Sequence, residues 1–196
     1  MKFSHLSALL TSLLHAFGET QEGMETVWQE DFAGRHALST AFFDRGHRII
    51  CRDVKYARRN DILSTAGFLV ILQCLRSMAS GALYWSAPPC SSWVFFSRGS
   101  TGRSRALPRG CRRHKKVREQ NRLVRRLIYL LQYLNQKGVL WVVEQPASSV
   151  LWYYGPMRRF LRKSKAIEIR VPLGQYGASS EHLVRRVFVS WFRIYL

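Results

Sequence analysis

The chain has 196 residues, 47% of them hydrophobic, so it is long enough to bury the core of one domain of ordinary size. Its 31 lysines and arginines stand against 12 aspartates and glutamates, and the net charge of +19 indicates an acidic partner such as nucleic acid. An aromatic content of 13% excludes a wholly disordered chain, and no stretch reaches the ~18 apolar residues of a membrane span. Four widely spaced cysteines without a C-x-x-C pair favour an intracellular, reducing compartment, which is compatible with the nucleus.

The first 24 residues contain a segment that could act as a targeting signal. Apolar side chains recur there at the spacing of one helix face, at Leu6, Leu9, Leu10, Leu13, Leu14 and Phe17. This pattern predicts an amphipathic helix followed by a link over residues 1–24. Lys2 before an apolar stretch of this length leaves a secretory signal peptide as the alternative.

Residues 25–196 alternate predicted strands with predicted helices. Strands are expected at 26–33, 48–54, 82–86, 139–144, 166–171 and 187–192. Helices are expected at 36–45, 66–80 and 117–136, and the last of these has one apolar and one cationic face. This alternation predicts an α/β fold with a mostly parallel, Rossmann-like sheet covered by helices on both faces.

A strongly basic segment interrupts the alternation between residues 98 and 116. It has no acidic residue, and it is rich in Gly, Ser and Pro. Its cations are Arg98, Arg103, Arg105, Arg109, Arg112, Arg113, Lys115 and Lys116. We expect a mobile basic loop that contacts the phosphates of a nucleic acid. A solvated flexible loop without a partner is the alternative.

Polar or reactive residues follow four of the predicted strands, where a parallel sheet binds its ligands. Asp53 comes nineteen residues after Gly34, close to the ~20 at which an acid binds ribose hydroxyls in nucleotide folds. Cys90 follows two prolines, and Glu144 ends a strand that is otherwise apolar. A buried small apolar role for Cys90 and a structural partner for Glu144 remain alternatives. The six histidines have no metal-like spacing, so no metal site is predicted.

These residues resemble, in order and rough spacing, the successive motifs of DNA cytosine-5 methyltransferases. The motifs are Phe32-Ala33-Gly34, Asp53, Asn60-Asp61-Ile62, Pro88-Pro89-Cys90 and Glu144-Gln145-Pro146, within residues 30–146. The resemblance implies a methyltransferase fold whose S-adenosylmethionine is held by Phe32, Gly34, Asp53 and Asp61. It also implies that Cys90 is the nucleophile and that Glu144 contacts the cytosine ring. With Trp93 and Gly102-Arg103-Ser104 included, the pattern also looks like a group of uncharacterised protist proteins with a methyltransferase-like core.

The chain departs from the family at several positions. Arg35, His36 and Ala37 stand where the family has glycines, and Gln145 stands where it has Asn. Residue 196 falls about where the family begins its target-recognition domain. We therefore expect one catalytic domain over 25–196 with a truncated or variant C-terminal end, no separate recognition domain, and a protein partner as one source of target recognition.

Two functions follow from these observations, and methylation of another substrate by the same fold is a third possibility because fold does not fix substrate. The first is an enzyme that transfers a methyl group to carbon 5 of cytosine in nucleic acid, with DNA favoured over RNA. The second is a catalytically inactive nucleic-acid-binding or scaffold protein that keeps the methyltransferase fold.

Overall fold

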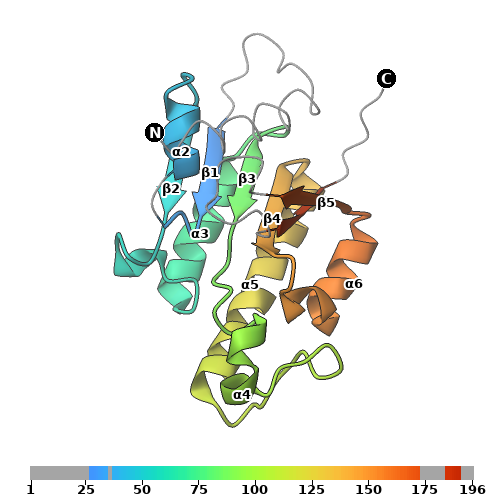
Figure 1. Ribbon diagram of the computed structural model, residues 1–196. Coiled ribbons are helices and arrows are strands. Elements are labelled where there is room, and N and C mark those ends of the chain that lie inside the picture. The colour runs from blue at the N-terminus through green and yellow to red at the C-terminus, as the bar shows by residue number, and fades with distance from the viewer. Residues whose placement is uncertain (1–26, 35–36, 173–183, 191–196) are drawn as a thin grey trace.

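The computed structural model describes residues 27–34, 37–172 and 184–190 (Figure 1). The predicted N-terminal helix and the end of the last predicted strand lie outside these residues. The strands are β1 (Val27–Asp31), β2 (Arg48–Arg52), β3 (Leu83–Ser86), β4 (Leu140–Pro146), β5 (Ile167–Pro172) and β6 (Val184–Val189). The α-helices are α2 (Ala37–Phe43), α3 (Thr65–Ser77), α4 (Arg98–Thr101), α5 (Lys115–Lys137) and α6 (Gly155–Lys163). Short 3-10 helices are η1 (Arg58–Asn60), η2 (Phe95–Ser97) and η3 (Val150–Tyr153).

The strands form one six-stranded sheet in the order β2-β1-β3-β4-β6-β5. Strands β1 to β4 pair in parallel, whereas β6 is antiparallel to both of its neighbours. The predicted α/β class and mostly parallel sheet are therefore confirmed, and the architecture is compatible with a Rossmann-like fold. Strand order reverses at β1, because β2 lies on one side of it and β3 on the other.

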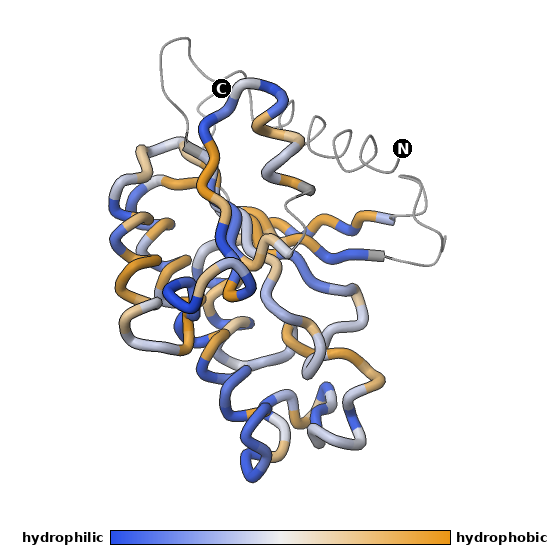
Figure 2. Tube along the Cα trace, turned by 90° about the vertical axis from the view of Figure 1, so that its left-hand side faces the viewer, coloured by the Kyte–Doolittle hydropathy of each residue, from blue (hydrophilic) through white to orange (hydrophobic). Residues whose placement is uncertain are grey.

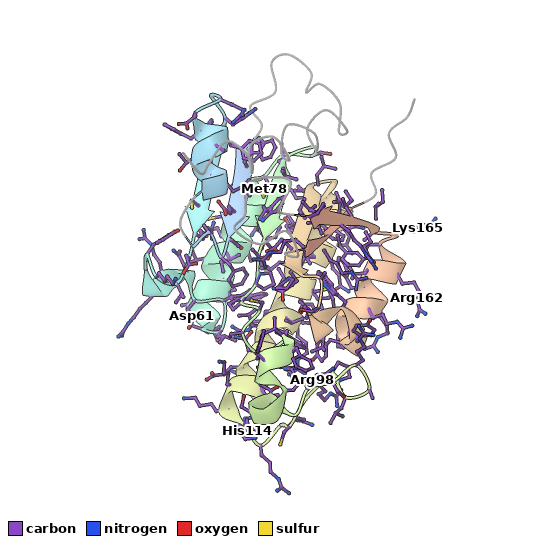
Figure 3. The ribbon with its side chains drawn as sticks, viewed as in Figure 1. Asp61, Met78, Arg98, His114, Arg162 and Lys165 are labelled. Carbon is purple, nitrogen blue, oxygen red and sulfur yellow. The ribbon has the colours of Figure 1, made fainter. Side chains whose placement is uncertain are left out.

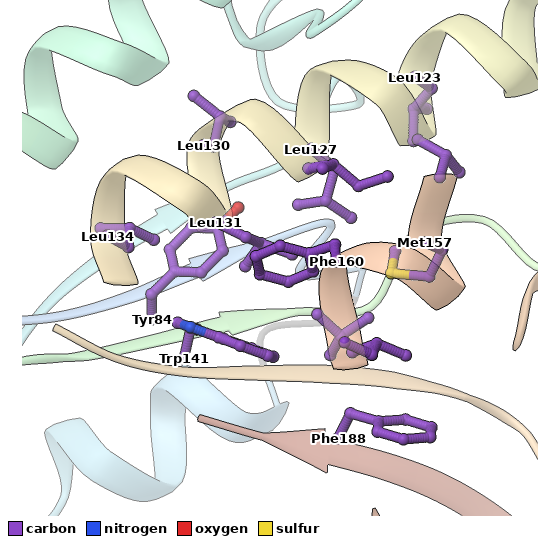
Figure 4. Close-up of a cluster of buried hydrophobic side chains, with 14 of the residues drawn as sticks. Tyr84, Leu123, Leu127, Leu130, Leu131, Leu134, Trp141, Met157, Phe160 and Phe188 are labelled. Atoms are coloured by element: carbon purple, nitrogen blue, oxygen red, sulfur yellow. The ribbon is translucent and has the colours of Figure 1, made fainter. Parts of the chain in front are cut away.

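Helices cover both faces of the sheet, as the sequence predicts. Residues of α3, α5 and α6 pack against Tyr84, Trp141 and Phe188 on one face, where Figure 4 shows the leucines of α5 above the aromatic rings. Leu38 and Phe42 of α2 pack against Trp28 on the other face. Figure 2 shows hydrophilic segments at the lower end of the molecule as well as in its upper loop and along its left side.

The helix α5 illustrates how the sequence dictates an element. Its buried residues lie along one side of the helix at i, i+3 and i+4 spacings, and they are Val117, Asn121, Leu123, Val124, Leu127, Ile128, Leu130, Leu131 and Leu134. Arg122 and Arg125 are exposed on its other side. Gly138 ends the helix with a φ of 76°, a left-handed conformation that glycine adopts without steric cost.

One α-helix of ordinary length, α6, is not among the helices predicted from the sequence. Met157, Phe160 and Leu161 are buried at the i, i+3, i+4 spacing, and a proline stands in the first turn, so the signal was present. Strand β6 begins at 184, three residues before its predicted start.

Among the helices that the structure describes, none combines the length and the apolar character needed to cross a bilayer.

Candidate functional site

The ends of β1, β2, β3 and β4 lie at one edge of the sheet. These strands are parallel neighbours, so their carboxyl ends point the same way, toward the lower half of the molecule in Figure 1. The edge therefore holds the predicted residues Gly34, Asp53, Cys90 and Glu144. The reversal of strand order at β1 makes this the place where an open α/β sheet binds ligands.

The turn after β1 has an unusual backbone. Phe32 has a φ of 64° and Gly34 a φ of 58°, both left-handed. For a residue with a side chain this conformation costs roughly 1–2 kcal/mol, and such strain is concentrated at functional sites. A Cβ atom built on Gly34 would meet no atom of the described residues within 4 Å, so none of these residues packs against the backbone there.

Asp53 is joined directly to this turn. Its Oδ2 accepts a hydrogen bond of 3.1 Å from the Gly34 amide, and its Oδ1 accepts one of 2.9 Å from the Lys55 amide. The Tyr56 hydroxyl donates to the Gly34 carbonyl at 3.0 Å. Two residues that the sequence pairs by spacing alone are therefore in contact.

Asp61 lies in the turn that begins α3. Its Oδ1 accepts from the Leu63 amide at 2.8 Å, and its carbonyl accepts from the Ser64 amide at 3.1 Å. Ser64 in turn caps the helix by accepting from the Gly67 amide at 2.9 Å. A Cβ atom at Gly67 would stand 2.1 Å from the Asp61 carbonyl oxygen, so this turn approaches α3 too closely for a larger residue. Figure 3 shows Asp61 toward the lower end of α3, and Met78 at its upper end.

The segment that carries Cys90 is fastened to the end of β4. Buried Gln145 donates from Nε2 to the Pro88 carbonyl, and Ser149 donates from Oγ to Gln145 Oε1 at 3.1 Å. The Val150 amide donates to the Trp93 carbonyl at 2.8 Å. Cys90 itself is half-buried. Gln145 thus holds the proline-cysteine turn in place.

Glu144 has the structural partner that the sequence left open. Arg185 of β6 places Nη1 at 3.2 Å from Glu144 Oε1, and the Glu144 side chain is 19% exposed. Burial raises the pKa of Glu144, and the charge of Arg185 opposes the shift. The carboxyl group is therefore held in one place and is easier to protonate than an ordinary glutamate.

A second buried carboxyl at this edge escaped the sequence analysis. Asp31 accepts from the Tyr84 hydroxyl at 2.8 Å and from Gln29 Nε2 at 3.0 Å. Burial raises the pKa of Asp31, while the charge of Arg52 lowers it. Both terminal nitrogens of the buried Arg52 guanidinium lack a hydrogen bond within the described part of the chain. An acid at the carboxyl end of a predicted strand was the available signal, as it was for Glu144.

The prediction that Arg103 contacts phosphates is wrong. Its side chain is 2% exposed, and its guanidinium lies 3.5 Å from the centre of the Trp93 ring. It donates to the Pro108 carbonyl and, at 3.1 Å, to Asn121 Oδ1. Burial lowers the pKa of Arg103 to about 10, so the group stays charged at neutral pH and holds the loop to α5.

The expectation of an unstructured loop over 98–116 also needs correction. Residues 98–101 form α4, residues 115 and 116 belong to α5, and Asn121 donates from Nδ2 to the Arg109 carbonyl at 3.0 Å. The other predicted cations are exposed, namely Arg98, Arg105, Arg109, Arg112, Arg113, Lys115 and Lys116. The segment is therefore a folded basic surface around a buried arginine.

A further group of cations was missed with α6. Arg158, Arg159, Arg162 and Lys163 are exposed on this helix, and Lys165 follows it. The Arg105 guanidinium lies 5.2 Å from the centre of the Tyr153 ring in η3, directly before α6. Figure 3 shows Arg162 and Lys165 along the same side of the molecule, above Arg98. The basic segment therefore contacts η3, the turn directly before α6.

Comparison of the chain with protein-family models finds no match, and comparison with curated protein sequences finds none either. Within the described ranges no group of three or more His, Cys, Asp or Glu side chains is arranged to hold a metal ion.

The raised pKa of Asp31 predicts how stability depends on pH. The folded pKa lies above the usual 3.8, so between these two values the folded chain binds more protons than the unfolded chain. This carboxyl therefore stabilises the fold at low pH, and its contribution declines as pH rises through the folded pKa. Urea denaturation from pH 4 to 8 should show the wild type losing stability relative to Asp31→Asn. Parallel profiles would contradict the assignment.

The buried position of Arg103 predicts a large loss of stability for Arg103→Met. The substitution leaves the Pro108 carbonyl and Asn121 Oδ1 without their donor, and we expect the free energy of unfolding to fall by about 3 kcal/mol. Arg105→Met is the matched control, because Arg105 is exposed, and it should change stability by about 0.5 kcal/mol at most. Equal effects of the two substitutions in chemical denaturation would show that Arg103 does not hold the loop.

Proposed function

We propose that the chain is an S-adenosylmethionine-dependent methyltransferase that modifies carbon 5 of cytosine in nucleic acid, with Cys90 as nucleophile and Glu144 as the acid. One observation carries the proposal. Cys90 follows β3, Glu144 lies in the last half of the neighbouring parallel strand β4, and the hydrogen bond from Gln145 to the Pro88 carbonyl ties the two strand ends together. The resemblance of the surrounding motifs to cytosine-5 methyltransferases supports the assignment of roles.

The residues at the ends of β1 and β2 fit a nucleoside cofactor. A carboxylate has about four acceptor positions, and Asp53 uses two of them on main-chain amides, which leaves one on each oxygen for ribose hydroxyls. The described residues leave room beside Gly34 for a ligand against the backbone. Phe32, Gly34, Asp53 and Asp61 are the residues that would hold the cofactor. When bound, S-adenosylmethionine supplies an electrophilic methyl group.

The chain's own groups would make carbon 5 reactive. Cytosine is a poor nucleophile at this carbon, so the Cys90 thiolate adds to carbon 6 and its electron pair forms the carbon–sulfur bond. Glu144, whose pKa is raised by burial, donates a proton or hydrogen bond to the adjacent ring nitrogen. After carbon 5 has gained the methyl group, a base removes its proton, and the electron pair expels Cys90 as a thiolate.

The exposed cations give this reaction a substrate surface. The basic segment contacts η3, directly before α6, and phosphate neutralisation requires such clusters on one side of a protein. Phosphate contacts carry no base information, so binding through this surface alone would discriminate little between sequences.

A catalytically inactive nucleic-acid-binding protein is the second candidate. The observation that favours it is that both oxygens of Asp53 already accept hydrogen bonds from main-chain amides. This acid therefore has a structural task that does not require a cofactor. The family's glycines are replaced here by Arg35, His36 and Ala37, and this replacement also favours the inactive binding protein.

An oligonucleotide that contains 5-fluorocytosine distinguishes the two candidates. In the presence of S-adenosylmethionine the enzyme should become covalently attached through Cys90, because the fluorine at carbon 5 cannot leave as a proton does. Cys90→Ser should form no adduct, since a hydroxyl lacks the nucleophilicity of a thiolate. Cys111→Ser is the matched control, because Cys111 is also half-buried, and it should react like the wild type.

Peptide mapping of the adduct by mass spectrometry identifies the residue that has reacted. An adduct on Cys90 supports the enzyme. Absence of an adduct on both single-stranded and duplex substrates would contradict it and leave the binding protein. An adduct that persists in Cys90→Ser would assign the nucleophile to another residue.

A further inference from the structure

Two adjacent phenylalanines stand out on the surface directly after the Cys90 segment. Phe96 is 97% exposed and Phe95 60% exposed, both in η2. Their rings make an edge contact, with centroids 6.3 Å apart and planes at 82°. Isolated exposed apolar residues need no explanation, but two large aromatic rings side by side are typical of a binding surface.

The surroundings of these rings are cationic. The guanidinium of Arg98 lies 4.6 Å from the centre of the Phe95 ring, and Arg98 is itself exposed. The sequence has no acidic residue between Asp61 and Glu119. A partner that is both flat and negatively charged therefore complements this surface better than an apolar protein segment does.

The segment of chain that carries the two rings is held in place by hydrogen bonds and packing. Ser97 donates from Oγ to the Val94 carbonyl at 2.8 Å, and Thr101 donates to the Ser97 carbonyl. Trp93 is fully buried, lies against Arg103 and is bonded through its carbonyl to the Val150 amide. The chain thus presents Phe96 from a fixed support, which lowers the entropy lost on binding.

We propose that Phe95, Phe96 and Arg98, here called the aromatic platform, bind an unpaired base of single-stranded nucleic acid. Every base has a flat π-face that stacks on an aromatic ring regardless of sequence, and a neighbouring arginine neutralises the adjoining phosphate. A paired base inside a duplex offers no such free face. The platform therefore selects single strands or extruded nucleotides, and it rests on the proposed function only in that the partner is nucleic acid.

Fluorescence anisotropy with a labelled single-stranded oligonucleotide tests the platform without S-adenosylmethionine. Phe96→Ala should weaken binding about 10-fold, the scale of one lost base–aromatic stack. Phe96→Trp should keep the affinity, whereas Phe96→Leu, which is apolar but not aromatic, should lose most of it. Phe43→Ala is the matched control, because Phe43 is 71% exposed but lies at the end of α2, and it should bind like the wild type.

An abasic strand of the same length separates stacking from charge. On this strand the wild type and Phe96→Ala should bind equally, whereas Arg98→Ala should flatten the plot of log affinity against log salt by about 0.7 on either strand. Equal binding of the wild type and Phe96→Ala to the base-containing strand would overturn the platform and point to a protein partner for these rings. An equal loss on the abasic strand, or full affinity in Phe96→Leu, would also overturn it.

The outcome is independent of the methyl-transfer proposal. The anisotropy measurement reads binding alone and is made without S-adenosylmethionine, so it does not depend on methyl transfer. Failure of the 5-fluorocytosine reaction with intact Phe96-dependent binding would remove only the enzymatic proposal.

Discussion

The parallel pairing of β1 to β4 is the constraint on which the candidate site depends. It brings four strand ends to one edge, although the residues they carry are separated by more than a hundred positions between Gly34 and Glu144. Two hydrogen bonds then fix neighbouring ends to each other, from the Gly34 amide to Asp53 and from Gln145 to the Pro88 carbonyl. Without these hydrogen bonds the turns would lie at the same edge of the sheet but would not be fixed in position relative to one another.

This edge carries unfavourable contributions to stability that the rest of the fold must offset. Asp31 and Glu144 are buried carboxyl groups with raised pKa values, and Phe32 has a left-handed backbone. Arg52 is a buried cation whose terminal nitrogens have no hydrogen-bond partner among the described residues. Buried charges and backbone strain of this kind persist where function requires them. The opposing contribution comes from the apolar core between the sheet and α3, α5 and α6, which contains the fully buried Trp141, Leu127 and Leu131.

Local patterns predicted most of the fold because they report burial directly. The period of Val124, Leu127, Ile128 and Leu131 predicts α5 to within two residues at its start and one at its end, and glycine or proline ends several strands and helices. The same spacing of apolar residues, at Met157, Phe160 and Leu161, predicts α6. The antiparallel direction of β6 could not be predicted, because it depends on pairing with β4, more than forty residues away in the chain.

The partners of charged side chains were the least predictable part of the site. By composition, Arg103 is one more cation of its segment. In the structure its partners are a tryptophan ring, two backbone carbonyls and Asn121. These contacts depend on the packing of α5 and cannot be read from the local sequence. Glu144 forms its ion pair with Arg185, which lies on the neighbouring strand β6. By contrast, Gly34 and Asp53 were paired correctly from spacing, because a β-α-β unit of fixed length brings such residues together.

The central claim is that the edge formed by β1 and β2 holds a nucleoside cofactor, and calorimetric titration of S-adenosylmethionine into the full chain tests it most directly. The account predicts binding by the wild type, weakened in Asp53→Ala by about 1.5–3 kcal/mol, the scale of hydrogen bonds to a charged group. Asp44→Ala should bind like the wild type, because Asp44 is exposed after α2, before the amino end of β2. Absence of binding by the wild type at millimolar cofactor, or equal affinity of the Asp53 and Asp44 variants, would contradict the claim.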